Sequence, residues 1–272
     1  MRLEVSGVCY TYGKEQVLDG VSFEAKENSI VSILGANGAG KTTLLKCLCN
    51  ILRPSSGSIT LDGQEMLALK GEALARRVGF VPQRVPVSAM TVFDAVLLGR
   101  KPHVKLAVTK KDLEIVSEIL EAMGLTPLAL RHLHQISGGE FQKVHIARAL
   151  AQEPQILILD EPSNNLDMAN QHKSLHLVEA IARQRGMCTI MTMHDVNLAL
   201  HYSDVFLFLA KGKVLAFGGK EIITEGLMRE VYGVESEIID HKGVPFVVPK
   251  HSSKYHLQSH AHPHDVHDHL SF

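Results

Sequence analysis

Short runs of apolar residues recur along the chain without alternating with polar positions. Four such runs lie at residues 29–34, 78–81, 155–159 and 188–193. A strand that is apolar throughout suits a sheet covered on both faces, as parallel sheets usually are. The runs therefore predict buried strands at the centre of a domain.

Segments with helical periodicity separate these apolar runs. They lie at residues 41–52, 109–124, 139–152 and 168–185. Strands that alternate with helices are typical of βαβ units, which build a mostly parallel sheet. The pattern therefore predicts an α/β core.

Three further segments depart from this alternation. The first 27 residues contain short strand-like pieces with a turn at Gly13, which indicates an antiparallel β layer. Residues 204–218 read as a hairpin that turns around Gly212. Residues 88–152 are mostly helical and lie between two predicted strands. We expect them to form a helical subdomain inserted into the α/β core.

Composition narrows the class of protein. The chain has 272 residues, of which 45% are hydrophobic and 21% charged, and its formal net charge is −1. This balance gives no electrostatic case for nucleic acid as a partner. No apolar run approaches the roughly 18 residues that a membrane helix requires, and the first residues lack a signal-peptide core. We expect a cytosolic chain, which could still attach to a membrane protein.

The last segment, residues 251–272, is low in complexity and holds seven of the sixteen histidines. It shows no core periodicity, so we expect a disordered tail that follows a domain of residues 1–250. Its imidazoles could bind Ni²⁺, Co²⁺ or Zn²⁺ as a regulatory device. A solvated tail that binds metals only incidentally is the alternative.

A glycine-rich loop follows the first apolar run. Residues 35–42 read G-x-x-x-x-G-K-T and precede an amphipathic helix, which is the context of a P-loop. The apolar face of this helix is predicted to hold Leu44, Leu45, Leu48, Ile51 and Leu52. The glycines Gly35, Gly38 and Gly40 let successive backbone N–H groups face one anion. Lys41 offers a positive charge to the β- and γ-phosphates, and the Thr42 hydroxyl can coordinate Mg²⁺.

Two carboxylates end the third apolar run, in the sequence "ILILDEP". Asp160 would hold Mg²⁺, directly or through water, and Glu161 would polarise the attacking water. The alternative is a strand that ends in surface acids. Together with the P-loop, this pair predicts a P-loop NTPase that uses Mg²⁺.

A helix start rich in small residues lies at "ISGGEFQKVHIARAL", residues 136–150. Ser137 and Glu140 have the spacing of a capping box. Two consecutive glycines, Gly138 and Gly139, are costly at a helix start unless something must approach the backbone closely. Because a helix N-terminus attracts anions, the stretch predicts an anion site.

At this point the sequence resembles the ATP-binding subunit of ABC transporters, over residues 1 to about 248. Its motifs occur in the order that the family has. They are Tyr12 in "YTYG", the Walker A loop "GANGAGKT", Gln83 of the Q-loop, the signature "SGGE" (137–140), the Walker B strand "ILILDE", the D-loop "NNLD" (164–167) and His194 in "MTMHD".

The resemblance implies roles for these residues. Tyr12 would stack on adenine, although an aromatic that packs in the β layer is the alternative. The resemblance extends the nucleotide-binding set to Asn37, Thr43 and Asp167. Asp167 has a second explanation, as the N-cap of the helix from residue 168.

The resemblance also implies two further catalytic side chains. The core that it implies is of the RecA-like P-loop NTPase type. Gln83 would contact Mg²⁺ or the attacking water. His194 would hydrogen-bond the γ-phosphate of ATP, although a histidine at a strand end is often only structural.

The implied assembly has two copies facing head to tail. The motif of Ser137, Gly138 and Gly139 would then close over ATP held by the other copy. Two transmembrane permease subunits and, indirectly, a substrate-binding protein would complete a transporter, with this chain peripheral on the cytoplasmic face. The family commonly has glutamine at position 140. We expect Glu140 to turn back to its own helix, away from the phosphate.

Likeness within the family is greatest to importers of metal chelates: ferric siderophores, haem or corrinoids. It rests on "MTVFDAVLLGRKPH" (90–103), "ALAQEP" and "YGVE". The "LLGRKPH" part would face the membrane subunits. The alternative function is a soluble ABC ATPase that acts on nucleic acid or ribosomes. Such proteins usually carry long coiled coils or two cassettes, and this chain has neither.

Overall fold

A computed structural model describes residues 1–164 and 166–250. The expectation of a disordered tail concerns residues that lie outside this range, as does Asn165 of the predicted D-loop. Within the described part of the chain, each helix is too short or too polar to cross a lipid bilayer.

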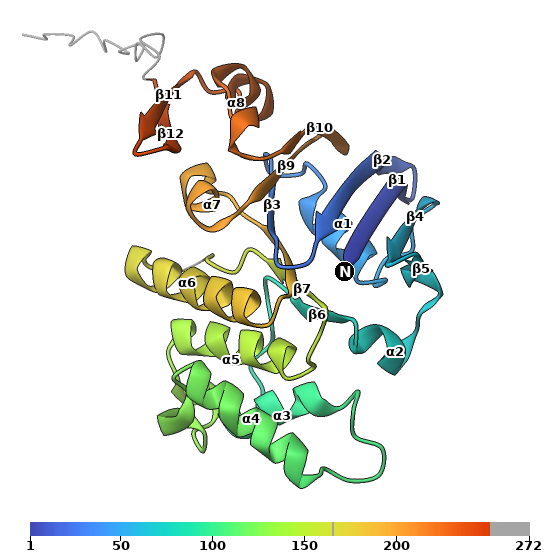
Figure 1. The fold of residues 1–272 in the computed structure, drawn as a ribbon, viewed down its shortest axis with the longest axis vertical. Coiled ribbons are helices and arrows are strands. Elements are labelled where there is room, and N and C mark those ends of the chain that lie inside the picture. Colours follow the sequence, from blue (N-terminus) through green and yellow to red (C-terminus); the bar gives the residue numbers. More distant parts are fainter. Residues whose placement is uncertain (165, 251–272) are drawn as a thin grey trace, which may run out of the picture.

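A six-stranded sheet forms the centre of the molecule, in the order β10-β9-β3-β8-β7-β6 (Figure 1). All neighbouring strands are parallel except β9 and β10, which form the predicted hairpin. The four predicted apolar strands are confirmed as neighbours in this sheet. The bounds are β3 (Ile30–Leu34), β6 (Val78–Val81), β7 (Ile156–Asp160), β8 (Cys188–Thr192), β9 (Val205–Ala210) and β10 (Lys213–Gly218).

Both faces of this sheet are buried, because successive side chains point to opposite faces. On β9, Phe206 and Phe208 pack in one hydrophobic cluster with the helices, whereas Leu207 and Leu209 pack in a second cluster. The second cluster also contains residues of an antiparallel sheet and of helix α1 (Lys41–Leu48). The antiparallel sheet, the six-stranded sheet and the helices on its other face therefore form three layers. The P-loop helix α1 lies between the two sheets.

The antiparallel sheet has the order β2-β1-β4-β5. Its first hairpin, which turns at Gly13, confirms the β layer predicted for the N-terminus. The sequence pattern did not predict the other two strands, which are short and partly exposed. The bounds are β1 (Arg2–Tyr12), β2 (Glu15–Lys26), β4 (Ser56–Leu61) and β5 (Gln64–Glu65).

Helices between β6 and β7 form a layer at the lower end of the view in Figure 1, as the sequence predicted. Helices α3 and α4 both contact α5, whose other side contacts α6. The bounds are α3 (Val92–Leu97), the 3₁₀ turns η2 (Leu98–Arg100), η3 (Thr126–Leu128) and η4 (Leu133–Gln135), α4 (Lys110–Ala122), α5 (Gly138–Leu150) and α6 (Met168–Gln184). Where domains begin and end along the chain stays a prediction.

Helix α1 is shorter than predicted. The periodicity suggested a helix over residues 41–52 with Ile51 on its apolar face, but the helix ends at Leu48 and Ile51 is 55% exposed. Asn50 adopts a left-handed conformation with φ 51°, which ends the helix. The N–H groups of Ile51 and Leu52 then both donate to the carbonyl of Lys46. Leu52 still packs against the core.

The remaining elements were not predicted by the apolar pattern, because they are short or lie at the surface. A C-terminal hairpin packs on α7, where Asn197 donates to the carbonyl of Val247 and accepts from its N–H. The bounds are η1 (Met66–Ala68), α2 (Gly71–Ala75), α7 (Val196–Tyr202), η5 (Lys220–Ile222), α8 (Glu225–Tyr232), β11 (Ser236–His241) and β12 (Val244–Pro249).

The packing of β9 gives a stability prediction. Leu207 is fully buried between the two sheets, so Leu207→Ala should lower the free energy of unfolding by about 2–5 kcal/mol. The matched control is Leu106→Ala, because Leu106 is fully exposed and its truncation should change stability by no more than about 0.5 kcal/mol. Urea denaturation measures both. Equal effects of the two substitutions would contradict the burial of this strand.

Candidate active site

The glycine-rich loop between β3 and α1 is shaped by close contact with other backbone. Gly35 has φ 150°, and a Cβ there would lie 2.1 Å from the carbonyl oxygen of Leu209. Gly40 has φ 102°, and its Cβ would lie 2.9 Å from the carbonyl oxygen of Val17. Both positions require glycine, because the left-handed region and the lack of space each exclude a side chain.

The loop surrounds the ammonium group of Lys41. Its Nζ donates to the carbonyl oxygens of Gly35, at 2.7 Å, and Ala36, at 3.1 Å. Burial lowers the pKa of this lysine. The loop and its surroundings enclose a pocket of about 320 Å³. The pocket is lined by Glu15, Val17, Asn37, Gly38, Ala39, Gly40, Lys41, Thr42, Thr43 and Glu161.

The carboxylate of Asp160 joins three elements at the carboxyl end of β7. Its Oδ1 accepts hydrogen bonds from the Thr42 hydroxyl of α1, at 3.2 Å, and from the Thr192 hydroxyl of β8, at 2.8 Å. Asp160 is only 3% exposed. Thr42 and Asp160, which we predicted to hold Mg²⁺ together, are therefore in direct contact, although 118 positions separate them in the sequence.

Glu161 gathers the other side chains that we predicted to act in catalysis. Its carboxylate accepts a hydrogen bond from the Gln83 amide and pairs with Nε2 of His194. Asn164 donates to the same carboxylate at 2.8 Å. Glu161 itself has φ 52°, an unusual conformation for a residue with a side chain. The structure thus brings Gln83, Glu161 and His194 together beside the glycine-rich loop.

Sequence reasoning missed one residue of this arrangement. The Thr192 hydroxyl donates to Asp160 and accepts the N–H of Glu161 at 2.9 Å. It lies directly opposite Asp160 in the pairing of β7 with β8. A polar residue at the end of a mostly apolar strand, two residues before His194, was the available signal. Asn164 was assigned to the D-loop, without a predicted contact to Glu161.

The capping box at the start of α5 is present as predicted. The N–H and hydroxyl of Ser137 both donate to the Glu140 carboxylate at 2.8 Å, and the Glu140 N–H donates to the Ser137 oxygen at 3.3 Å. These bonds from Ser137 lower the pKa of Glu140. The carboxylate therefore turns back to its own helix, as expected.

The two glycines of this helix start differ from those of the P-loop. Beyond the chain neighbours and the backbone of their own helix, no described atom lies within 4 Å of a Cβ built on Gly138, and one built on Gly139 would touch only Asn170 at ordinary distance. Their own chain leaves room for side chains here. Gly138 lines a separate pocket of about 350 Å³ together with Gln83, Asn164 and His145. Burial lowers the pKa of His145 to about 4.

Two predicted site residues lie apart from this cluster. Tyr12 is 47% exposed and packs edge-on against Tyr10, and the described residues that line the P-loop pocket do not include it. Asp167 caps α6 by accepting the N–H of Asn170 at 2.8 Å. The structural explanation of Asp167 is therefore confirmed, and a role in binding nucleotide stays a prediction for both residues.

A glycine-rich loop that cradles a lysine, followed by Asp160 and Glu161 at the end of a buried strand, defines the class of P-loop nucleotide-hydrolysing proteins. A family model described as ABC transporter matches residues 18–164. The chain belongs to the ABC transporter family as an ATP-binding subunit, and it is an ATPase.

Relatives in sequence support this assignment along nearly the whole chain. The uncharacterised ABC transporter ATP-binding protein MJ0089 of Methanocaldococcus jannaschii is 49% identical over 249 residues, which cover 92% of this chain and 98% of that protein. The ferric enterobactin transport ATP-binding protein FepC of Escherichia coli is 36% identical over 254 residues, covering 91% and 94%. The hemin import ATP-binding protein HmuV of Pseudomonas entomophila is 36% identical over 257 residues, covering 91% and 100%.

Two solved structures extend the comparison. One is a transporter described as of the metal-chelate type, in an inward-facing conformation, with a TM-score of 0.80, 30% identity and coverage of 92% of this chain and 97% of that chain. The other is the ATP-binding cassette MJ0796, a dimer bound to ADP and phosphate, with a TM-score of 0.70, 27% identity and coverage of 80% and 98%.

The contacts of Thr192 give a second prediction. Thr192→Val should lower the free energy of unfolding by about 1–3 kcal/mol, because the Glu161 N–H and Asp160 each lose a buried partner. The same substitution on the same strand provides the control. Thr189 Oγ1 is buried with no hydrogen-bond partner in the described residues, so Thr189→Val should be neutral or stabilising. Thermal denaturation of both variants tests this, and equal losses would contradict it.

Proposed function

We propose that this chain is the ATP-hydrolysing subunit of an importer of a metal chelate, a ferric siderophore, haem or a corrinoid. It would act as a head-to-tail dimer on the cytoplasmic face of a membrane, attached to two permease subunits and served by a substrate-binding protein. The observation that carries the proposal is the meeting of Gln83 and His194 at the carboxylate of Glu161, which lines the P-loop pocket.

Glu161 is the general base in this proposal. Its carboxylate lines the pocket next to the P-loop, where the γ-phosphate of ATP would end, and its side chain is 10% exposed. His194 and Gln83 contact its two oxygens from opposite sides and so orient them toward an attacking water. Lys41 would exchange its contacts with the loop carbonyls for phosphate oxygens.

Mg²⁺ fits the donors beside this base. The Thr42 hydroxyl, the Asp160 carboxylate and the Gln83 amide are hard oxygen ligands of the kind that Mg²⁺ prefers, and Thr42 and Asp160 already lie 3.2 Å apart. When bound, the ion would neutralise the developing charge on the phosphates. Thr192 would hold Asp160 in place during the reaction.

The second half of each ATP site would come from the other copy. Ser137, Gly138 and Gly139 do not line the P-loop pocket of their own chain, within the part that the structure describes. The space around Gly138 supports the approach of an outside group to the N–H groups of this helix start. The dimeric cassette MJ0796, found with ADP and phosphate, supports this arrangement.

The proposal that the cargo is a metal chelate rests on similar proteins. FepC is described as a ferric enterobactin transport protein, HmuV as a hemin import protein, and the similar solved transporter as of the metal-chelate type. The exposed segment after α3 would face the permease subunits. Leu98 and Leu106 supply apolar surface there.

Substitution of the base tests the proposed chemistry. Glu161→Gln should retain ATP affinity but lower kcat for ATP hydrolysis by about 10²–10⁴-fold, because the amide cannot accept the proton of water. Glu230→Gln, at an exposed site on α8, is the matched control and should hydrolyse ATP at the wild-type rate. A Glu161→Gln variant with normal turnover would remove Glu161 from this role.

The same pair of variants tests transport. The chain co-expressed with permease and binding-protein genes would be assayed for ATP-dependent uptake of labelled ferric siderophore, haem and corrinoid. Uptake of one of these by the wild type, and its loss in Glu161→Gln, supports the proposal. Uptake of none, with ATP hydrolysis intact, argues against a metal-chelate cargo.

Gly138 provides the test of the head-to-tail dimer. Gly138→Asp should leave the chain as stable or more stable, because it removes a helical glycine and adds an acid at a helix N-terminus, effects of about 0.3–1 kcal/mol each. The added carboxylate would repel a γ-phosphate from the partner. In a Glu161→Gln background with MgATP, light scattering should therefore show a monomer.

Gly226→Asp is its control, since Gly226 also lies in the first turn of a helix, α8, with no close contact to a built Cβ. This variant should dimerise normally with MgATP. Equal dimerisation of both variants would place Gly138 outside the interface. Loss of ATP affinity in monomeric Gly138→Asp would instead indicate that the motif acts on its own P-loop.

A further inference from the structure

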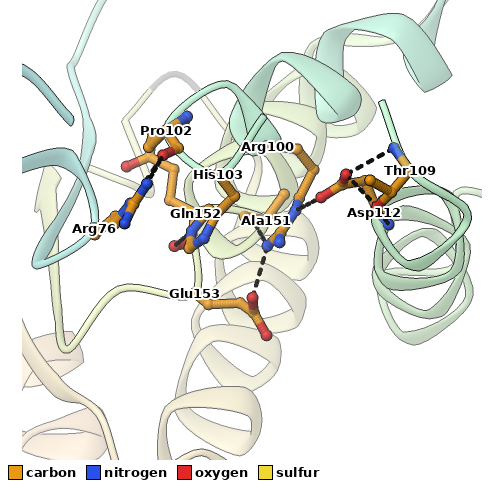
Figure 2. Close-up of polar contacts among 9 residues, drawn as sticks. All are labelled: Arg76, Arg100, Pro102, His103, Thr109, Asp112, Ala151, Gln152 and Glu153. Carbon is orange, nitrogen blue, oxygen red and sulfur yellow. Dashed lines mark hydrogen bonds and ion pairs between the residues drawn. The ribbon is translucent and has the colours of Figure 1, made fainter. Parts of the chain in front are cut away.

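A buried guanidinium links three segments of the helical layer. Arg100, in η2, is 3% exposed. Its Nε donates to Asp112 of α4 at 2.9 Å, and its Nη1 donates at 2.7 Å to both the Ala151 carbonyl and the Glu153 carboxylate (Figure 2). Ala151 is the C-cap residue of α5. One side chain therefore joins the end of η2, the start of α4 and the end of α5.

The acceptor on α4 is itself held in place. Asp112 accepts the N–H of Thr109 at 2.9 Å and its hydroxyl at 2.7 Å, in a capping box. The Thr109 bonds, followed by the ion pair with Arg100, lower the pKa of Asp112 to about 2. The carboxylate is therefore charged at neutral pH, and Arg100 is its buried counter-ion.

The backbone after Arg100 is fixed from two further directions. Arg76, at the end of α2, donates twice to the Pro102 carbonyl, at 2.8 and 2.7 Å. His103 Nε2 donates to the Gln152 carbonyl at 2.9 Å, just beyond α5 (Figure 2). Gly99 lies so close to α5 that a Cβ would be 2.1 Å from the Arg148 carbonyl. Residues 99–103 and the C-terminal end of α5 thus form one connected unit.

The surface beyond this unit is exposed and apolar. Lys101, Val104 and Val108, within the segment 101–108, border a groove of about 470 Å³. The groove is lined by Met90, Asp94, Leu97, Leu98, Lys101, Val104 and Val108. At the opposite end of α5, 13 residues and about 20 Å away, lies Gly138. Because helices move as rigid bodies, a displacement of the fixed end carries the other end with it.

We propose that Arg100 is a positioning residue that ties the exposed segment 101–108 to the C-terminal end of α5, so that a membrane subunit acting on this segment moves Gly138. The inference rests on the proposed function, because it requires a permease partner. The motion would pass through the simultaneous hydrogen bonds that the Arg100 guanidinium makes to Asp112, Ala151 and Glu153. A lysine ammonium group cannot make all of these bonds at once.

Hydrogen exchange of the isolated chain tests the tie itself. The N–H groups of His103 and Val104 donate to the Arg100 carbonyl at 2.8 and 3.2 Å. In Arg100→Met these amides should exchange about tenfold faster, because the segment opens more often without the buried ion pair. Unchanged exchange would overturn the inference before any partner is added.

The transporter complex in proteoliposomes tests transmission. Arg100→Met should keep the ATPase rate of the isolated chain within about twofold of wild type, while solute transported per ATP hydrolysed falls about fivefold or more. The control is Ile59→Ala, a truncation of a fully buried residue in the antiparallel sheet, which lowers Tm but should keep the wild-type ratio. If Arg100→Met does not fold, Arg100→Lys replaces it, since lysine keeps the charge and the apolar stem.

The possible outcomes distinguish failure of the inference from failure of the proposed function. A reduced ratio in the Arg100 variant at a Tm where Ile59→Ala keeps its ratio supports the inference. Equal ratios in the two variants, with a functional wild-type transporter, overturn the inference and leave the proposed function intact. A wild-type chain that hydrolyses ATP without any permease-dependent transport removes the proposed function, and the inference with it.

Discussion

The geometry of the candidate active site depends on one buried carboxylate. Desolvation of Asp160 is tolerable only because hydroxyl groups from two other elements, α1 and β8, donate to the same oxygen. These bonds fix the P-loop helix against the ends of β7 and β8. The Thr192 hydroxyl also takes the N–H of Glu161, which holds that residue in its left-handed conformation. The carboxylate that we propose as the base is thereby oriented by the same hydroxyl group that anchors Asp160.

Strand order explains why the remaining side chains meet at Glu161. In the sheet, β7 lies between β8 and β6, and the loops that follow parallel strands emerge at the same edge. His194 comes two residues after the end of β8, and Gln83 two residues after the end of β6. They therefore reach the two oxygens of Glu161 from opposite sides. Residues separated by 78 and 33 positions become neighbours through topology alone.

The sequence predicted those parts of the fold and site that depend on strong local patterns. The buried strands, the P-loop and the Ser137 capping box belong to this group, because apolar runs and glycine or cap spacing determine them locally. Ile51 was misplaced because a left-handed Asn50 ends the helix one turn early, which periodicity does not reveal. Thr192 was missed because its role comes from strand pairing with Asp160. The short strands β4, β5, β11 and β12 are stabilised by their partners more than by their own pattern.

Glycine has two different structural roles in this chain. Gly35 is required by its own fold, since a side chain would strike the backbone of Leu209. Gly138 is not required in that way, because its surroundings in the described chain are open. Glycine lowers the stability of this helix start, and the space that it leaves is not filled by the described part of its own chain. Such a helix start is suited to contact with a partner. The cost at Gly138 and the buried anchor at Arg100 lie at opposite ends of α5. In the proposed transporter, this helix would convert an outside contact at one end into closure over ATP at the other.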